Sequence, residues 1–299
     1  MRRRFESVLV VSKKSAYDLY VRQHKMRRVQ ELLRKKDPSV ERLVRADKHH
    51  RETLDEVRAA LKELGLKARF RDRAQRGSVD EFDLVLTVGG DGTLLSVSHD
   101  LATTPILGIN SAPLDSVGFL AGAQKGNVLE RLTSIVEGRT PLQRLTRMRV
   151  SVDGREVHRR VLNEVLFAHK SPAMTSRYFL TVDDVTEEHK SSGFYIGPAV
   201  GSTAAIRSAG GRVLPLRSKK LQLIVREPYT PDGSRYQVER ALIDPGTKIE
   251  ALNKMREGYL FLDGPRQPLA LEMGQRVSFD LSPEPLCVFG IDRKKLEAT

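Results

Sequence analysis

The stretch of residues 84–95 constrains the fold of this chain more than any other. An apolar run, residues 84–88, stops at Gly89-Gly90-Asp91-Gly92-Thr93, and a helix-compatible run follows. A short apolar run that ends in glycines before a helix is typical of a buried strand in an open α/β sheet. Ligands bind such sheets beyond the carboxyl ends of the strands, which is where this turn falls.

The turn itself favours phosphate chemistry. Glycine lets a backbone approach a ligand closely, and the amides of such a turn can face phosphate oxygens. Asp91 adds a carboxylate that could contact a hydroxyl group beside the phosphate. The turn therefore indicates phosphoryl transfer to an alcohol. Neither the P-loop spacing nor G-x-G-x-x-G is present, and the alternative is an ordinary turn built from glycine and aspartate.

The first 143 residues alternate between strand-like and helix-like segments. This alternation predicts an open, Rossmann-like α/β domain. Asn110 directly follows an apolar strand, so it falls at the same edge of the sheet as the glycine turn. Strands are expected at residues 7–11, 67–70, 84–88 and 105–109, and helical segments within residues 16–36, 54–64 and 93–102.

After about residue 143 the pattern becomes that of a β-rich, sandwich-like domain. Turn signals occur at Asp153-Gly154, Asp232-Gly233 and Asp263-Gly264. The exception is the helix-compatible segment 202–209, closed by two glycines. Strands are expected at residues 147–152, 161–167, 177–182, 221–225, 259–262 and 277–281.

Two further polar elements could bind a ligand. The small residues Gly201-Ser202-Thr203-Ala204-Ala205 leave room for a flat base or a ribose, although serine and threonine there could equally cap a helix. Asn163-Glu164 interrupts an apolar, strand-like segment. Asn is unfavourable inside a strand and a buried carboxylate needs a partner, so either ligand recognition or an exposed strand end would explain the pair.

Composition bounds the partners and the location. The net charge is +13, and residues 1–50 hold 15 Lys and Arg against 6 Asp and Glu. Nucleic-acid binding is one interpretation of this surplus, but no zinc or RNP pattern supports it, so we expect a solvated basic face and no nucleic acid.

No apolar run nears the ~20 residues of a membrane span. The single cysteine, Cys287, fits a reducing, cytoplasmic location, and the scattered histidines predict no protein-held metal.

With these elements placed, the chain resembles the NAD kinase family over about residues 5–290. Gly89 to Thr93, Asn163-Glu164 and Gly201 to Ala204 are spaced as in that family, and the combination is specific, whereas lipid kinases share only the first. Gly108-Ile109-Asn110 with Gly118-Phe119-Leu120 is similar to a fourth segment, interrupted by residues 111–117. Ser192, Ala205 and Pro198-Ala199-Val200 depart from the common bacterial pattern. Residues 191–211 look most like the plant NADH kinase branch, which is similar in this respect to mitochondrial NAD kinases.

The resemblance implies a two-domain fold: residues 1–143, residues 144–283, and a segment 284–299 that returns to the first domain. It implies ATP or polyphosphate as donor, Mg²⁺ carried with ATP, NAD or NADH as acceptor between the domains, and a homodimer or homotetramer. The reaction would be phosphoryl transfer to the adenosine 2′-hydroxyl. A lipid kinase of the diacylglycerol type and a non-catalytic dinucleotide sensor are the alternatives.

The resemblance also assigns roles to residues. Asp91 would be the catalytic residue, which accepts the proton of the hydroxyl or orients it. Lys190 and Arg177 could contact phosphate or carboxamide groups, and could equally be surface cations. The binding residues that the resemblance implies are Gly90, Gly92, Thr93, Asn110, Phe119, Asn163, Glu164, Lys190, Ser192, Gly201, Ser202, Thr203, Ala204 and Ser208.

Overall fold

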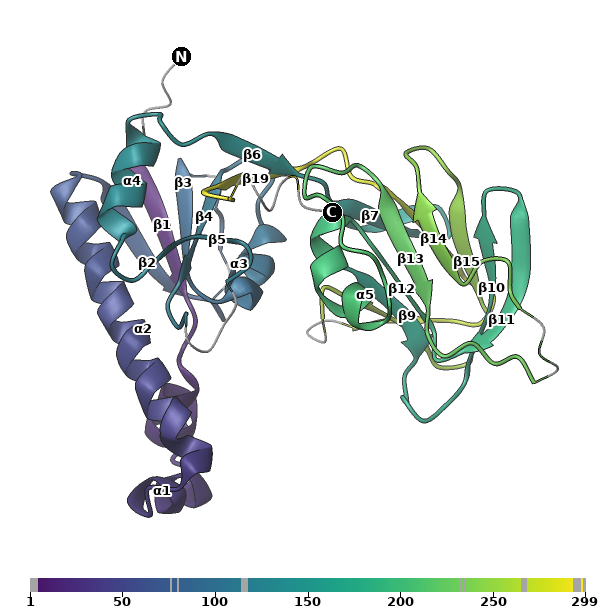
Figure 1. Ribbon diagram of the computed structural model, residues 1–299, viewed down its shortest axis with the longest axis horizontal. Helices are drawn as coiled ribbons and strands as arrows, with labels where there is room; N and C mark the ends of the chain where they lie inside the picture. Colours follow the sequence, from purple (N-terminus) through teal and green to yellow (C-terminus); the bar gives the residue numbers. More distant parts are fainter. Residues whose placement is uncertain are drawn as a thin grey trace. The chain divides into compact units, whose positions relative to one another are not determined.

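The computed structural model describes residues 5–75, 77–79, 81–113, 118–231, 233, 235–264, 268–292 and 297. The chain divides into two compact units (Figure 1). The first comprises residues 1–143 and 287–292, and the second residues 144–286 and 293–299. Asp232 of one predicted turn and residues 114–117 of the predicted interruption lie outside the described residues.

The first unit contains a seven-stranded sheet with the order β2-β1-β3-β4-β19-β6, in which β5 pairs with β4. The pairs of β1 with β2 and β3, and of β4 with β3, β5 and β19, are parallel. β3 is buried along its whole length, as expected for a central strand. The strands are β1 (Ser7–Ser12), β2 (Lys67–Asp72), β3 (Leu84–Gly89), β4 (Ile106–Asn110), β5 (Ala121–Gln124), β6 (Leu142–Leu145) and β19 (Leu286–Phe289).

The helices of the first unit are η1 (Asp18–Gln23, π-helical), α1 (Arg27–Arg34), α2 (Pro38–Glu63), α3 (Asp91–Ser98) and α4 (Val128–Val136). The Asp37 carboxylate caps α2 by accepting the Ser39 amide, and Pro38 is well placed in the first turn of the helix. Apolar residues of α2 and α4 pack in the same core as β1, β3 and β4. The α/β prediction is therefore confirmed, although α3 ends four residues earlier than expected.

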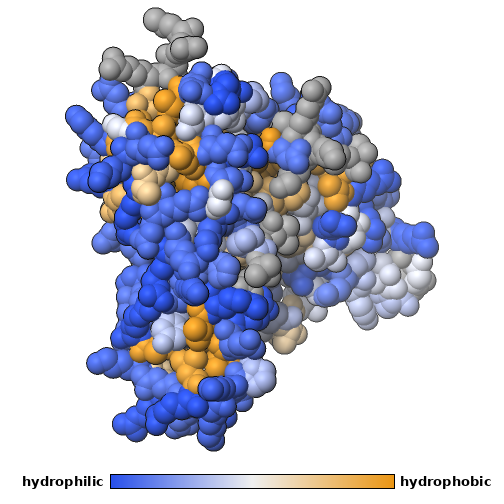
Figure 2. All heavy atoms as spheres, turned by 60° about the vertical axis from the view of Figure 1, so that its left-hand side comes forward, coloured by the Kyte–Doolittle hydropathy of each residue, from blue (hydrophilic) through white to orange (hydrophobic). Residues whose placement is uncertain are grey.

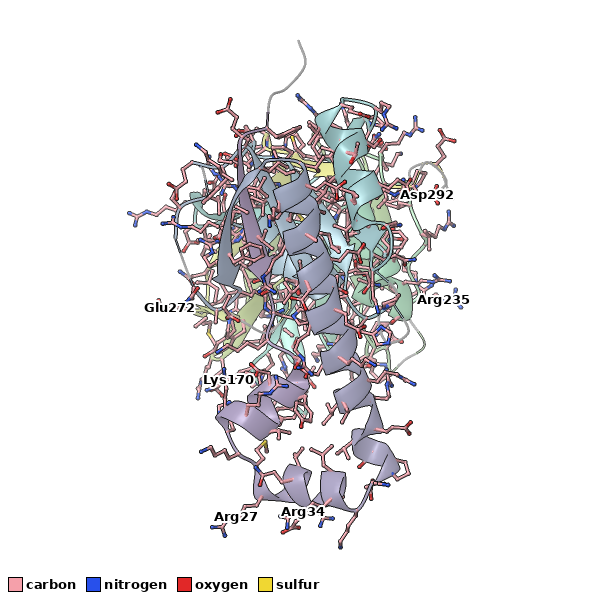
Figure 3. All side chains as sticks on the ribbon, turned by 90° about the vertical axis from the view of Figure 1, so that its left-hand side faces the viewer. Arg27, Arg34, Lys170, Arg235, Glu272 and Asp292 are labelled. Carbon is pink, nitrogen blue, oxygen red and sulfur yellow. The ribbon has the colours of Figure 1, made fainter. Side chains whose placement is uncertain are left out.

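The N-terminal helices carry much of the basic surplus on an exposed surface. No residue of η1 or α1 is buried, and Arg27 and Arg34 project outward from α1 (Figure 3). Tyr20, Met26 and Val44 are among the exposed large hydrophobic residues of the chain. Figure 2 shows apolar surface between hydrophilic residues on this part of the molecule. Among the described helices, none combines the length and apolar content needed to cross a membrane.

The second unit is built from two six-stranded antiparallel sheets, so the β-rich prediction is confirmed. One sheet has the order β11-β10-β15-β18-β7-β8 and the other β14-β13-β12-β9-β16-β17. Phe167 and Phe194 stack with their ring centroids 5.1 Å apart in the core that both sheets share.

The first of these sheets consists of β7 (Met148–Val152), β8 (Arg155–Val161), β10 (Ser176–Val182), β11 (Val185–Ser191), β15 (Ile249–Asn253) and β18 (Arg276–Leu281). The second consists of β9 (Val165–His169), β12 (Phe194–Gly197), β13 (Leu221–Val225), β14 (Arg240–Ile243), β16 (Gly258–Leu262) and β17 (Pro268–Leu271). The 3-10 helix η2 (Ala199–Thr203) and the one-turn helix α5 (Ala205–Ser208) follow β12.

One predicted strand is wrong. Residues 161–167 do not form a continuous strand, because β8 ends at Val161 and β9 begins at Val165 in the other sheet. Asn163-Glu164 lies in the connection between the sheets, where a polar pair breaks no ladder of hydrogen bonds. By contrast, Asp153-Gly154 forms the predicted hairpin turn between β7 and β8, with positive φ at both residues.

Candidate functional site

The glycine turn connects the buried strand β3, which ends at Gly89, to helix α3, which begins at Asp91. Gly89 must lack a side chain, because a Cβ there would overlap the Thr93 hydroxyl oxygen. The Thr93 amide then donates to the Gly90 carbonyl at 2.9 Å. Gly92 is exposed, and a Cβ there would meet no atom within 4 Å. Packing within the described residues therefore explains Gly89 but does not explain Gly92.

The Asp91 carboxylate is fixed by a loop that lies far from it in the sequence. Its Oδ2 accepts the Phe119 amide and its Oδ1 accepts the Leu120 amide, each at 2.8 Å. A carboxylate has about four lone-pair directions, so each oxygen keeps acceptor capacity for another donor. Asp91 is thus held in place and can still accept a hydrogen bond from a hydroxyl group.

Asn110 supports the same loop. Gly118 has φ +59°, and a Cβ there would overlap the side-chain amide of Asn110. The Asn110 Oδ1 accepts the Ala112 amide at 3.1 Å. The structure therefore brings the predicted residues Asp91, Asn110 and Phe119 together at the carboxyl edge of the sheet.

Two cations at this turn were missed by the sequence analysis. The Lys13 amide donates to the Val88 carbonyl at 3.4 Å, and the Lys13 Cδ would lie 3.5 Å from a Cβ on Gly89. The Arg73 amide donates to the Ser12 carbonyl at 2.8 Å, and its Nη1 donates to the Gly92 carbonyl at 3.4 Å. Both residues directly follow the last residue of a strand, β1 or β2. Their position directly after two parallel strands is the sequence signal that would have identified them.

His50 lies buried behind the same edge. Its Nδ1 is 2.8 Å from the Ser111 hydroxyl, and the Ser111 amide donates to the Gly89 carbonyl at 3.1 Å. Burial lowers the pKa of His50, and the positive charge of Lys13 lowers that pKa further. His50 is therefore a neutral hydrogen-bonding partner that supports the turn from behind.

In the second unit, Asp263 organises the Asn163-Glu164 connection. Its carboxylate accepts the amides of Leu162, Asn163 and Glu164 at 2.8, 2.7 and 3.0 Å. Its own amide donates to the Glu164 carbonyl at 2.9 Å. From the sequence, Asp263 is predicted only as part of a turn. Its distance along the chain from Asn163 concealed this role.

Gly201 has a packing role that the structure makes clear. A Cβ on Gly201 would overlap the Asn163 carbonyl, and so would a Cβ on Gly197. Both glycines let the segment before α5 lie directly against the Asn163-Glu164 connection. The two predicted elements therefore touch through the backbone.

Within the described residues, one carboxyl oxygen of Glu164 has no hydrogen-bond partner. Its Oε2 is buried and accepts or donates no hydrogen bond within the described residues. Burial raises the pKa of Glu164 to about 7, and the negative charge of Asp263 contributes in the same direction. Buried polar atoms almost always have a partner, so this orphaned carboxyl is an independent sign of a ligand.

The hydroxyl groups of the small-residue element do not cap α5. Ser202 is completely buried, and its Oγ donates to the Ala199 carbonyl at 2.6 Å and accepts the Leu214 amide at 2.8 Å. The Thr203 hydroxyl donates to the Val200 carbonyl at 3.1 Å. Both hydroxyl groups close the preceding 3-10 turn, so the helix-cap alternative is wrong. The half-buried Thr203 and Ala204 lead from this turn into α5.

A cavity of about 450 Å³ lies beside α5. Arg226 stacks its guanidinium over the Tyr195 ring, 5.3 Å from the centroid, and donates to the Ser192 carbonyl at 3.2 Å. The Ser192 hydroxyl donates to Glu227. Lys190 and Arg177 are opposite each other on β11 and β10 and do not line the cavity. The lining residues are Tyr195, Ala205, Ser208, Ala209, Val225, Arg226, Glu227, Pro228 and Arg240.

Comparisons with known proteins identify the family of the chain. Residues 2–140 match the family described as the ATP-NAD kinase N-terminal domain. The chain is similar to a probable NADH kinase of Oryza sativa subsp. japonica, with 31% identity over 72% of this chain and 73% of that protein.

Two solved structures share the fold. An NAD kinase from Archaeoglobus fulgidus in complex with ATP has a TM-score of 0.71 and 23% identity, over 97% of this chain and 95% of that one. Yeast NADH kinase complexed with NADH has a TM-score of 0.67 and 14% identity, over 98% and 86%.

Proposed function

The chain belongs to the NAD kinase family, and on that premise we propose that it phosphorylates the adenosine 2′-hydroxyl of NAD or NADH with ATP as donor. A bond forms between the 2′-oxygen and the γ-phosphorus of ATP, and the bond from that phosphorus to the β,γ-bridging oxygen breaks. The products are ADP and NADP or NADPH, and the hydroxyl proton passes to Asp91 and then to solvent. The observation that carries the proposal is the Asp91 carboxylate, fixed by two amides beside an open glycine turn.

Asp91 orients the acceptor hydroxyl and takes its proton. The carboxylate oxygens keep free lone pairs, and the two amides prevent the side chain from rotating away. Phosphoryl transfer depends mainly on positioning and on stabilisation of charge. A positioned base typically adds ~10²–10⁴-fold. Orientation by Asp91 is therefore as important as its basicity.

The donor phosphates bind at the turn. The amides of Gly90, Gly92 and Thr93 lie at the start of α3, where helix dipoles favour anions. The open space at Gly92 leaves room for a close approach of phosphate oxygens. Lys13 and Arg73 supply positive charge at the same turn. The same amides and cations would bind the end of a polyphosphate chain. We propose polyphosphate as a second phosphoryl donor.

Mg²⁺ would enter with the donor. Within the described residues, no group of three or more His, Cys, Asp or Glu side chains is arranged to hold a metal ion. The lack of such a group among the described residues fits an ion that is held mostly by substrate phosphates and water, as is common for Mg²⁺. When bound, the ion neutralises charge on the phosphates.

The acceptor binds through residues of the second unit. Glu164 supplies a buried carboxyl that needs a partner, and Asn163 is fixed next to it by Asp263. Thr203, Ala204 and Ser208 would line the adenine or ribose pocket. Phe119, which belongs to the first unit, is proposed as a further contact of the dinucleotide. Ser192 would act through its contacts with Arg226 and Glu227 beside the cavity. Gly201 and Ser202 would shape the backbone that these residues share, and Lys190 would contact a phosphate group.

We further propose that the protein is a cytoplasmic homo-oligomer. The buried, free thiol of Cys287 is compatible with a reducing compartment. Multi-angle light scattering on the purified chain measures the number of subunits, and a monomeric mass would contradict this part of the proposal.

The reaction is tested by product analysis. The full-length protein is incubated with ATP or tripolyphosphate, with Mg²⁺, and with NAD, NADH or diacylglycerol in turn, and the products are separated by chromatography. We expect NADP or NADPH from ATP. Phosphatidic acid formed from diacylglycerol would favour the lipid kinase instead. Dinucleotide binding without any product, at every Mg²⁺ concentration, would favour the sensor.

A further inference from the structure

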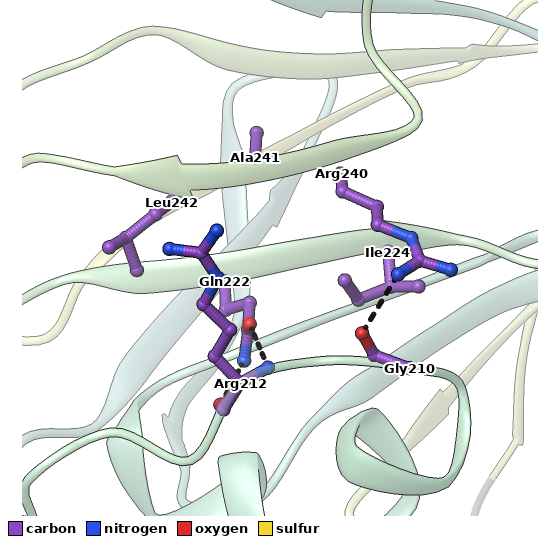
Figure 4. A pocket seen from close by; sticks show the side chains of 7 residues that line it. All are labelled: Gly210, Arg212, Gln222, Ile224, Arg240, Ala241 and Leu242. Carbon is purple, nitrogen blue, oxygen red and sulfur yellow. Dashed lines mark hydrogen bonds between the residues drawn. The ribbon is translucent and has the colours of Figure 1, made fainter. Parts of the chain in front are cut away.

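A second cavity of about 250 Å³ lies in the second unit, between the turn after α5 and the strands β13 and β14 (Figure 4). Two arginine side chains, Arg212 and Arg240, border it (Figure 4). Among the residues that the structure describes, no carboxylate lines this cavity, and Arg240 is the one that it shares with the cavity beside Ser208. Its lining residues are Gly210, Arg212, Gln222, Ile224, Arg240, Ala241 and Leu242.

Two hydrogen bonds fix the backbone of Arg212, and its side chain is exposed. The Arg212 amide donates to the Gln222 Oε1 at 2.7 Å, and the Gln222 Nε2 donates to the Arg212 carbonyl at 3.0 Å (Figure 4). Gln222 is buried, so it cannot easily move. Within the described part of the chain, no carboxylate pairs with the exposed Arg212 guanidinium. A positive charge is thus held at the cavity without being neutralised.

Arg240 is positioned from the opposite wall. It lies on β14 opposite Ile224 of β13, and its Nη1 donates to the Gly210 carbonyl at 3.1 Å. Gly210 has φ +89°, and a Cβ there would come within 3.0 Å of the Arg240 Nη2. Glycine at this position therefore lets the guanidinium approach the turn. A guanidinium has five N–H donors, so most of those of Arg240 remain for a ligand.

The chemistry of this cavity favours a phosphoryl group. Guanidinium groups bind phosphate oxygens in a bidentate manner that lysine does not reproduce. The buried Ile224, together with Ala241 and Leu242, forms the apolar part of the lining beside the two arginines. The volume is below the about 300–1,000 Å³ of typical small-molecule pockets, so the cavity suits a phosphate or pyrophosphate group more than a whole dinucleotide.

We propose that this cavity is a second phosphate-binding site, separate from the donor site at the glycine turn. Its ligand is inorganic phosphate, pyrophosphate or the end of a phosphoanhydride chain, held between Arg212 and Arg240. The site belongs entirely to the second unit. It therefore requires neither Asp91 nor the donor site.

Nuclear magnetic resonance of the full chain, labelled with ¹⁵N in its arginine side chains, tests this directly. Phosphate and pyrophosphate are titrated while the Nε–Hε signals are followed, with assignments from Arg212→Gln and Arg240→Lys. We expect saturable shifts of the Arg212 and Arg240 signals. Arg73 reports the donor site separately, so either site can fail without the other. Unchanged Arg212 and Arg240 signals in millimolar pyrophosphate would overturn the proposal.

Affinity measured by calorimetry gives a second readout. Arg212→Gln should weaken pyrophosphate binding at the second site by about tenfold or more, because a charge-assisted pair is lost. Arg256→Gln is the matched control, since it removes one exposed arginine of the same unit that does not line the cavity. An equal loss in both variants would show that general charge, and not this cavity, attracts the anion. Thermal unfolding of each variant checks that the unit is folded.

Discussion

The Asp91 carboxylate accepts the backbone amide of Phe119 at 2.8 Å, across 28 residues of sequence. The adjacent Leu120 amide binds the other oxygen of the same carboxylate. The proposed catalytic group is therefore oriented by the loop that also supplies a proposed dinucleotide contact. Changes in either partner should affect turnover through the position of this carboxylate.

Asp91→Asn should lower kcat for NADP formation by ~10²–10⁴-fold, the usual contribution of a positioned base. Asparagine presents one oxygen and one NH₂ group, so it cannot accept both amides and cannot take a proton. Steady-state kinetics, with NAD affinity measured separately by calorimetry, checks this prediction. Asp184→Asn, in an exposed turn, is the control. Full turnover by Asp91→Asn would remove Asp91 from the catalytic role.

Gly92→Ala should weaken the use of ATP without loss of stability, whereas Gly201→Ala should lower the stability of the fold. Alanine at Gly92 meets no atom and favours the helix, so stability should hold or rise by up to about 1 kcal/mol. The KM for ATP should nevertheless rise about tenfold, because the methyl group occupies the space of the phosphate. Alanine at Gly201 overlaps the Asn163 carbonyl and should cost about 3 kcal/mol or more. Chemical denaturation and ATP kinetics on both variants separate the two effects, and unchanged ATP kinetics for Gly92→Ala would argue against a phosphate at this residue.

Lys13→Met should raise the KM for ATP by about tenfold, and Arg73→Gln should have a similar effect. Each variant removes a cation that lies at the glycine turn. Lys14→Met is a matched control, because Lys14 is the exposed neighbour of Lys13. Donor kinetics should also become less sensitive to salt in the two site variants. The same KM in Lys13→Met and Lys14→Met would show that Lys13 does not contact the donor.

Glu164 should make the free protein less stable as the pH rises. Burial raises the pKa of Glu164 to about 7, against about 4.5 in an unfolded chain. The folded state therefore holds a proton that the unfolded state has lost between these pH values. Stability falls as the pH rises from about 4.5 to 7, by roughly 3 kcal/mol at most.

Glu164→Gln should remove this loss, so the variant should be more stable than the parent at pH 8 and nearly equal at pH 4.5. Glu130→Gln, an exposed residue of α4, is the control. Urea unfolding of the ligand-free chain at several pH values gives the measurement. A parent protein whose stability is flat across this range, or matches Glu164→Gln at pH 8, would contradict the raised pKa.

Local patterns determined what the sequence could reveal. The apolar run of β3, the glycines after it and the alternation of later strands are features of neighbouring residues. They predicted the α/β and β-rich architecture and the place of the Asp91 turn. The resemblance to NAD kinases rested on the same local segments. The same local pattern marks the Asn163-Glu164 pair as unusual, but it does not reveal that the pair lies between two sheets.

Tertiary structure decided the contacts that join distant segments. Lys13 and Arg73 become neighbours of Gly89 and Gly92 only because β1, β2 and β3 align their carboxyl ends in one sheet. Asp263 reaches the amide of Asn163 across 100 residues. Gly201 is required because Asn163 packs against it. The sequence alone therefore predicted which segments hold the candidate site residues. The folded chain decided which side chains meet, because hydrogen bonds and steric fit depend on distance in space and not on distance along the chain.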